Sequence, residues 1–98
     1  MTIEIKKNAS EMILEISGRL DTTTAPAFDK TITENLDSSK NLILDFKCLE
    51  YISSAGLRVL LSAQKKMQQS SVMKVINVCE SVMEVFEITG FADILNIE

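Results

Sequence analysis

The 98-residue sequence contains no histidine, and this absence excludes several kinds of active site. Catalytic Ser-His and Cys-His pairs require an imidazole as the general base. The three glycines, Gly18, Gly56 and Gly90, are isolated from one another, so no glycine-rich loop is available to bind phosphate groups. The carboxylates fall on segments predicted to face water, where acids rarely acquire the shifted pKa of a catalytic group. We therefore predict neither an enzyme nor a bound cofactor.

Cysteine and basic residues are also scarce. Cys48 and Cys79 are the two cysteines, and both stand in or beside apolar stretches, so we expect reduced, small core residues. Without a Cys-x-x-Cys motif or a histidine, they predict no zinc site. Ten basic residues face fourteen acidic residues, which gives a net charge of −4, and the basic residues form no cluster. A nucleic-acid partner is not expected, because it requires a basic face.

Long apolar runs and a targeting segment are absent as well. No stretch approaches the roughly 20 apolar residues that a membrane-spanning helix requires. The first five residues, MTIEI, do not combine a basic segment with an apolar core, so no signal peptide is predicted. We therefore expect a cytoplasmic protein with no membrane partner. The length and the 46% hydrophobic content predict one globular domain over residues 1–98.

The first part of the chain has the pattern of a hairpin followed by a helix. Residues 2–7 and 11–17 alternate apolar and polar side chains, which predicts two antiparallel strands that end at Gly18. A loop follows, and Thr24 is expected to cap a helix because Pro26 lies in its first turn.

The segment from Asn41 to Leu61 changes character along its length. The run LILDF at 42–46 predicts a strand buried on both faces, as inside a parallel sheet. Residues 47–52 are a mixed connector. A helix is then predicted to begin at the sequence SSAG, residues 53–56, because leucines follow at helical spacing.

The remaining residues predict one more strand and one more helix. Residues 72–78 are rich in β-branched side chains and indicate a buried strand. Ser81 and Glu84 have the spacing of a capping box for a short helix that Gly90 terminates. Residues 91–98 either add a brief strand or pack as an apolar plug. The prediction is an α/β domain of order ββαβαβα, with a single mixed sheet: an antiparallel N-terminal hairpin and then parallel strands.

The start of the second helix is the candidate functional feature. The first N–H groups of a helix have no partner within the helix and lie at the positive end of its dipole. A phosphate on Ser53 or Ser54 would therefore meet free donors and a favourable field. The alternative is that these serines only cap the helix.

The motifs around this position resemble those of STAS domains, most closely the free-standing bacterial anti-sigma factor antagonists. The similarity lies in LDF at 44–46 and YISSAGL at 51–57, and in the loop GRLD at 18–21 with Thr24 and Ala25. The resemblance implies the STAS fold over nearly the whole chain. It also implies a protein that binds an anti-sigma factor, which is itself a serine kinase, and so frees a sigma factor.

In that family the kinase phosphorylates the antagonist and the complex breaks, and a serine phosphatase of the metal-dependent class reverses the modification. The resemblance places the acceptor at Ser54, two residues before Gly56, with Ser53 as the alternative acceptor. Ser53 stands where the family usually has an aspartate. That difference favours the alternative function, a STAS binding module in a signalling or transport assembly that is never phosphorylated.

In either binding function, we expect the partner-contact surface to gather residues from two parts of the chain: Asp21, Thr22, Thr23, Ser53, Ser54, Gly56 and Arg58. For Asp21 and the two threonines, the alternative is a loop that only caps a helix. Arg58 is expected to pair with a phosphate or an acidic partner face, or else to be a solvated surface arginine. A third hypothesis is a small enzyme or a nucleotide-binding protein, and a nucleotide titration of the purified domain is expected to show no binding.

Overall fold

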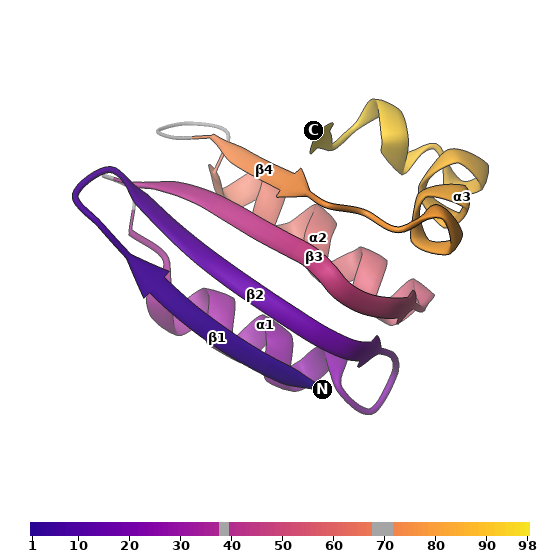
Figure 1. The fold of residues 1–98 in the computed structure, drawn as a ribbon, viewed down its shortest axis with the longest axis horizontal. Coiled ribbons are helices and arrows are strands. Elements are labelled where there is room, and N and C mark those ends of the chain that lie inside the picture. The colour runs from indigo at the N-terminus through magenta and orange to yellow at the C-terminus, as the bar shows by residue number, and fades with distance from the viewer. Residues whose placement is uncertain (38–39, 68–71) are drawn as a thin grey trace.

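The computed structural model describes residues 1–37, 40–67 and 72–98, and in these residues five strands form one sheet that carries three α-helices (Figure 1). In chain order the elements are β1 (Thr2–Lys7), β2 (Glu11–Leu20), α1 (Ala25–Asn35), β3 (Asn41–Ile52), α2 (Ser54–Met67), β4 (Met73–Ile76), α3 (Glu80–Thr89), a 3-10 turn η1 (Phe91–Asp93) and β5 (Asn96–Ile97). β1 and β2 run antiparallel, and β3, β4 and β5 each run parallel to the strand before them. The predicted mixed sheet is therefore confirmed, and the C-terminal residues do add a brief strand.

The sheet is covered by α1 and α2 on one face, while α3 lies beyond the carboxyl end of β4 (Figure 1). The strand residues that face these helices are buried, including Leu14 in β2, Leu44 in β3 and Val75 in β4. Phe28 of α1 and Leu60 of α2 meet them in the core. Burying each of these large side chains stabilises the fold by about 1.5–3 kcal/mol.

The opposite face of the sheet is only partly covered, which corrects one prediction. Burial alternates along β3, so that Leu42 and Leu44 are buried while Ile43 and Asp45 between them are half-buried. A strand buried on both faces was predicted for 42–46, and this is wrong because α1 and α2 pack against the same side.

Two strands are longer than predicted, because β-bulges change the periodicity of their side chains. Gly18 does not end β2; the strand continues to Leu20 through a glycine with φ +94°. The predicted connector at 47–52 is the second half of β3. The register between β2 and β3 shifts twice, and at each shift β3 contains one extra residue. These extensions place Leu20 beside Ile52 and so bring together the segments that follow β2 and β3.

The helix ends agree with the predictions only in part. Thr24 takes the N-cap position of α1, with Pro26 in the first turn, but its side chain makes no capping hydrogen bond. The capping box predicted for Ser81 and Glu84 is wrong, because α3 begins one residue before Ser81, with Cys79 at the N-cap. Gly90 ends α3 in the left-handed conformation, at φ +83°, as predicted.

The cysteines differ from each other in their surroundings. Cys48 is exposed, and this corrects the expectation of a core residue: it pairs in register with Ser17, on the sheet face away from α1 and α2. Cys79 is half-buried, and its thiol lies 3.4 Å from the Ser81 hydroxyl. That contact, followed by the backbone N–H of Val82, lowers the pKa of the Cys79 thiol. Both thiols are free.

Candidate functional site

The candidate site forms where β2 and β3 end side by side. Leu20 and Ile52 are register partners at these ends. The backbone N–H of Ser53 then donates to the carbonyl of Leu20 at 2.8 Å, which joins the residue before α2 to the end of β2. The two sequence segments predicted to form one contact surface are therefore neighbours in space.

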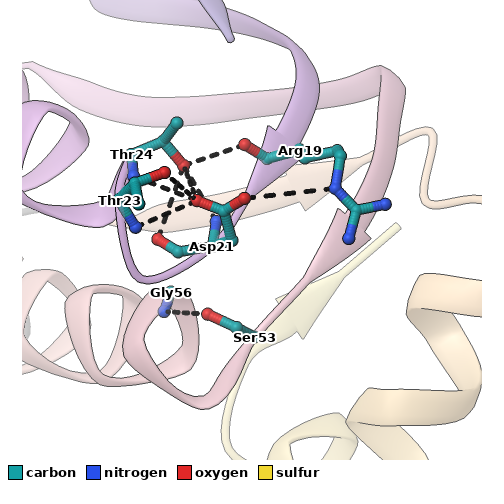
Figure 2. A network of polar contacts seen from close by, with 6 residues as sticks. All are labelled: Arg19, Asp21, Thr23, Thr24, Ser53 and Gly56. Atoms are coloured by element: carbon teal, nitrogen blue, oxygen red, sulfur yellow. Dashed lines mark hydrogen bonds and ion pairs between the residues drawn. The ribbon is translucent and has the colours of Figure 1, made fainter.

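The two serines at the start of α2 have different roles. Ser53 occupies the N-cap position: its hydroxyl oxygen lies 3.4 Å from the backbone N–H of Gly56, and its carbonyl accepts from the N–H of Leu57 at 3.0 Å. Its side chain is half-buried and turned toward the helix (Figure 2). Ser54 is the first residue of α2 and is exposed, and within the described residues its hydroxyl has no hydrogen-bond partner. The capping interpretation thus applies to Ser53, while the hydroxyl of Ser54 faces solvent.

The loop after β2 is organised by the carboxylate of Asp21 (Figure 2). Its Oδ1 accepts hydrogen bonds from the Thr23 hydroxyl at 2.7 Å, the Thr23 N–H at 3.0 Å and the Thr24 N–H at 3.1 Å. The Thr24 hydroxyl donates to the carbonyl of Arg19 and accepts from the N–H of Asp21, each at 2.8 Å. Asp21 thus bonds the residues two and three positions ahead, as an N-cap does, one turn before α1.

These hydrogen bonds also change the acidity of Asp21. The Thr23 hydroxyl, and after it the Thr24 backbone N–H, stabilise the ionised carboxylate and lower its pKa. The carboxylate is therefore charged at neutral pH, and its hydrogen bonds stabilise the loop. Thr22 and Thr23, by contrast, are exposed.

Gly56 was predicted to contact a partner, but it is buried. A Cβ at this position would lie 2.8 Å from Cγ of Leu20 and 2.9 Å from Cγ1 of Ile52. Gly56 therefore allows the first turn of α2 to approach the ends of β2 and β3. Its role at the site is to support the exposed residues around it.

A groove of about 360 Å³ lies between α1 and α2, and Ala55, the residue after Ser54, is part of its lining. Its lining includes Thr22 from the loop and Arg58 from α2, so it connects two of the predicted contact residues. The groove was missed in the sequence because its walls come from two helices whose relative position depends on the tertiary fold. Its lining residues are Thr22, Ala25, Pro26, Asp29, Ala55, Arg58, Val59 and Ser62.

A second missed feature is a stack between Arg19 and Tyr51. The guanidinium carbon of Arg19 lies 4.3 Å from the centre of the Tyr51 ring, and its Nε lies 4.0 Å from Oδ2 of Asp21. The two residues are register partners only because of the second bulge in β3. No pattern in the sequence reveals that bulge, so the pairing required the structure.

Two kinds of feature are absent from the described residues. None of the helices in this part of the chain has the length and apolar character of a membrane span. Among the same residues, no group of three or more histidine, cysteine or acidic side chains is arranged to hold a metal ion. The site thus combines an exposed hydroxyl on the first residue of α2 with a groove between α1 and α2.

Comparisons with known proteins agree with this description. A family model for the STAS domain matches residues 2–98. The chain is similar to the anti-sigma-B factor antagonist of Bacillus subtilis (strain 168), with 26% identity over 99% of this chain and 90% of that protein. It is also similar to the anti-sigma-B factor antagonist of Listeria monocytogenes serovar 1/2a (strain EGD-e), with 29% identity over 100% of this chain and 89% of that protein. An anti-sigma factor antagonist from Mycobacterium paratuberculosis has the same fold, with a TM-score of 0.89 at 23% identity over 98% of this chain and 83% of that one.

Proposed function

The chain belongs to the STAS domain family, and we propose that it is an anti-sigma factor antagonist whose activity is switched off by phosphorylation of Ser54. The proposed partner is an anti-sigma factor that is also a serine kinase, and binding to it frees the sigma factor. A serine phosphatase of the metal-dependent class is proposed to restore the active form. The protein itself acts by binding and not by catalysis, in the cytoplasm, where its partners regulate transcription.

The observation that carries the proposal is that one serine caps α2 while the other is exposed. The Ser53 hydroxyl faces the helix N–H groups, so the capping role is already filled. The Ser54 hydroxyl is exposed on the first residue of α2, where a kinase can reach it. Modification of Ser54 therefore removes no capping interaction.

The proposed modification is a transfer of the terminal phosphoryl group of ATP held by the kinase. The Ser54 oxygen forms a bond to the γ-phosphorus, the bond from this phosphorus to the bridging oxygen breaks, and ADP leaves. The hydroxyl proton passes to a base of the kinase. The phosphatase removes the group by a separate reaction: water attacks the phosphorus, the bond from phosphorus to the serine oxygen breaks, inorganic phosphate leaves, and the serine oxygen takes up a proton to become a hydroxyl again.

The phosphate would act through its charge. It adds about −1.5 to −2 at neutral pH. Within the domain this charge is tolerated, because it lies at the positive end of the α2 dipole. In the interface the phosphate would lose its hydrating water and face the partner's side chains, and the cost of this desolvation favours release. The proposed switch therefore changes affinity and leaves the fold intact.

The proposed contact surface consists of exposed residues around Ser54. Thr22, Thr23 and Arg58 are exposed beside it, and the groove between α1 and α2 extends from them. Asp21 and Ser53 hold the two loops in place from within. Arg58 lies one turn after Ser54 on α2, where it can pair with an acidic group of the partner or with the phosphate.

Phosphate mapping with the cognate kinase tests the acceptor. Incubation with the kinase and ATP should add one phosphate to Ser54, measured by mass spectrometry of peptides. Ser54→Ala should take up no phosphate and stay bound to the kinase in the presence of ATP. Ser53→Ala, the matched control, should still be phosphorylated. Phosphate found on another residue of Ser54→Ala, with release of the partner, would remove Ser54 from the proposal.

The same experiment separates the alternative function. Ser53 stands at the position where the family usually has an aspartate, which favours a STAS module that is never phosphorylated. Under that alternative the wild type binds its partner, remains unmodified in the presence of ATP, and is recovered from cells without phosphate.

A further inference from the structure

The guanidinium group of Arg19 makes two contacts that leave most of its N–H donors without an acceptor among the described residues. It stacks over the ring of Tyr51 at 4.3 Å from the ring centre. Its contact to Asp21, from Nε to Oδ2 at 4.0 Å, is too long for a hydrogen bond (Figure 2). Within the described residues, no other acceptor lies within hydrogen-bond distance of its five N–H groups.

The nearest carboxylate is only loosely paired with Arg19. Oδ1 of Asp21 accepts hydrogen bonds from Thr23 and Thr24, and only Oδ2 faces Arg19, at 4.0 Å from its Nε. Closer pairs form elsewhere on the surface, since Lys6 and Glu15 meet at 2.8 Å. The side chain of Arg19 is 61% exposed, so its charged edge faces solvent.

The Arg19–Tyr51 stack lies on the side of the sheet opposite Ser54, so a phosphate on Ser54 is not its ligand. Leu20 and Ile52 are buried and contact Gly56 of α2, so they point to the helix side of the sheet. Arg19 and Tyr51 precede them directly along β2 and β3 and are exposed, so they point to the opposite side. A ligand for Arg19 must therefore come from outside the domain.

A guanidinium held over an aromatic ring is prepared to bind an oxyanion. Stacking on the ring removes much of the rotational freedom that a free arginine would lose on binding. The planar fork of N–H groups matches the two oxygens of a carboxylate. Arginine and tyrosine are also the residue types that dominate binding energy at protein interfaces. A nucleic-acid phosphate is disfavoured as the ligand, because the chain has a net charge of −4 and no basic cluster.

We propose that the Arg19–Tyr51 stack is a receptor for a carboxylate side chain of the protein that docks at Ser54. This inference rests on the proposed function, because it assumes that the anti-sigma factor kinase is that protein. Arg19 then determines which kinases are accepted: one with an aspartate or glutamate opposite the stack binds, and one with a basic residue there is repelled.

Binding kinetics with the cognate kinase test the proposal. Arg19→Gln should weaken binding of the unphosphorylated protein about tenfold or more, and Arg19→Glu should weaken it further, with a slower association rate at low salt. Tyr51→Leu should weaken binding several-fold through loss of the stack, whereas Tyr51→Phe should bind as the wild type does. Lys65→Gln, which removes an exposed positive charge from the last turn of α2, is the matched control and should leave affinity unchanged.

A search for the partner's carboxylate completes the test. Among substitutions of the kinase's acidic surface residues to lysine, one should restore binding to Arg19→Glu while weakening binding to the wild type. If Arg19→Gln binds as tightly as the wild type, or if no such substitution restores binding, the receptor assignment is wrong. The receptor assignment is also wrong if Arg19→Gln changes only the melting temperature of the phosphorylated protein and leaves kinase binding unchanged. The ligand of Arg19 would then be the chain's own phosphate. Failure of the wild type itself to bind the kinase would instead contradict the proposed function.

Discussion

Gly56 occupies a position in α2 where any side chain would collide with the core. A Cβ there would lie 2.8 Å from Leu20 and 2.9 Å from Ile52, both of which are buried. Alanine gains up to about 1 kcal/mol over glycine in helix propensity. Overpacking a core costs about 1–3 kcal/mol, so the collision should outweigh this gain. Gly56→Ala should therefore lower the melting temperature by about 5 °C or more, measured by circular dichroism.

The matched control for this change lies two residues earlier on the same turn. Ser54→Ala adds no atom and removes a hydroxyl that has no partner among the described residues, so its melting temperature should stay close to that of the wild type. If Gly56→Ala melts like Ser54→Ala, the turn must be able to move away from the strands. The close approach of α2 to Leu20 would then not be required for stability.

At this scale the sequence predicted a candidate site but did not separate its two hydroxyls. Ser53 and Ser54 are adjacent and chemically identical, so spacing and the family resemblance could only rank them. The division of roles depends on where α2 begins, and a shift of one residue would exchange them. Cys48 shows the same limit, because its exposure follows from the sheet face to which the register assigns it.

Among the elements, the hairpin and helices could be predicted because their apolar spacing is regular. The second half of β3 could not, because its buried residues Phe46, Leu49 and Ile52 are three positions apart. That spacing breaks the period of two that identifies a strand, and the two bulges in β3 cause it. Gly18, with its positive φ, looked like a strand end for a related reason, since the same backbone conformation serves in both turns and bulges.

The turn before α1 carries a prediction about acid stability. Hydrogen bonds from Thr23 and Thr24 lower the pKa of Asp21 in the folded state below its ordinary value of 3.8. The ionised carboxylate therefore stabilises the fold above the unfolded-state pKa, and this contribution is lost as the pH falls through the lowered folded-state pKa. Asp21→Asn retains an acceptor oxygen but removes the titration. Its melting temperature should therefore fall less than that of the wild type between about pH 4 and pH 2.

Two further variants are compared in the measurement of melting temperature against pH. Asp29→Asn removes a carboxylate from the exposed surface of α1 and should follow the wild-type curve in acid. Asp21→Ala removes the acceptor altogether and should lower the melting temperature by several degrees at neutral pH, as loss of an N-cap does. Parallel acid curves for Asp21→Asn and the wild type would show that this carboxylate does not stabilise the turn.

For the whole molecule, the arrangement of layers decides which surfaces are available to partners. α1 and α2 lie on one side of the sheet (Figure 1), so the carboxyl ends of β2 and β3 can be reached from two sides. Ser54 lies on the helix side, and the exposed Arg19 and Tyr51 lie on the open side. An interface of standard size buries about 800 Å² on each protein, and the proposed partner is expected to contact both positions. Binding of one partner would then depend both on the phosphorylation of Ser54 and on the charge of Arg19.

The last prediction concerns how far the effect of phosphorylation spreads through the domain. Ser54 lies outside the core, its neighbour Ser53 keeps the cap, and the loop of Asp21 is held by its own hydrogen bonds. No packed element therefore has to move when the phosphate arrives.

Backbone amide shifts in NMR spectra of the phosphorylated protein should change only near residues 21–24 and 53–58, and the melting temperature should stay within about 3 °C of the wild type. Affinity for the kinase should nevertheless fall by about a hundredfold or more, because the added charge must be desolvated in the interface. Ser54→Ala treated with kinase and ATP should show neither change. Amide shifts that extend into β4 and α3 would instead indicate a rearrangement of the fold, and release of the partner would then follow from conformation and not from charge.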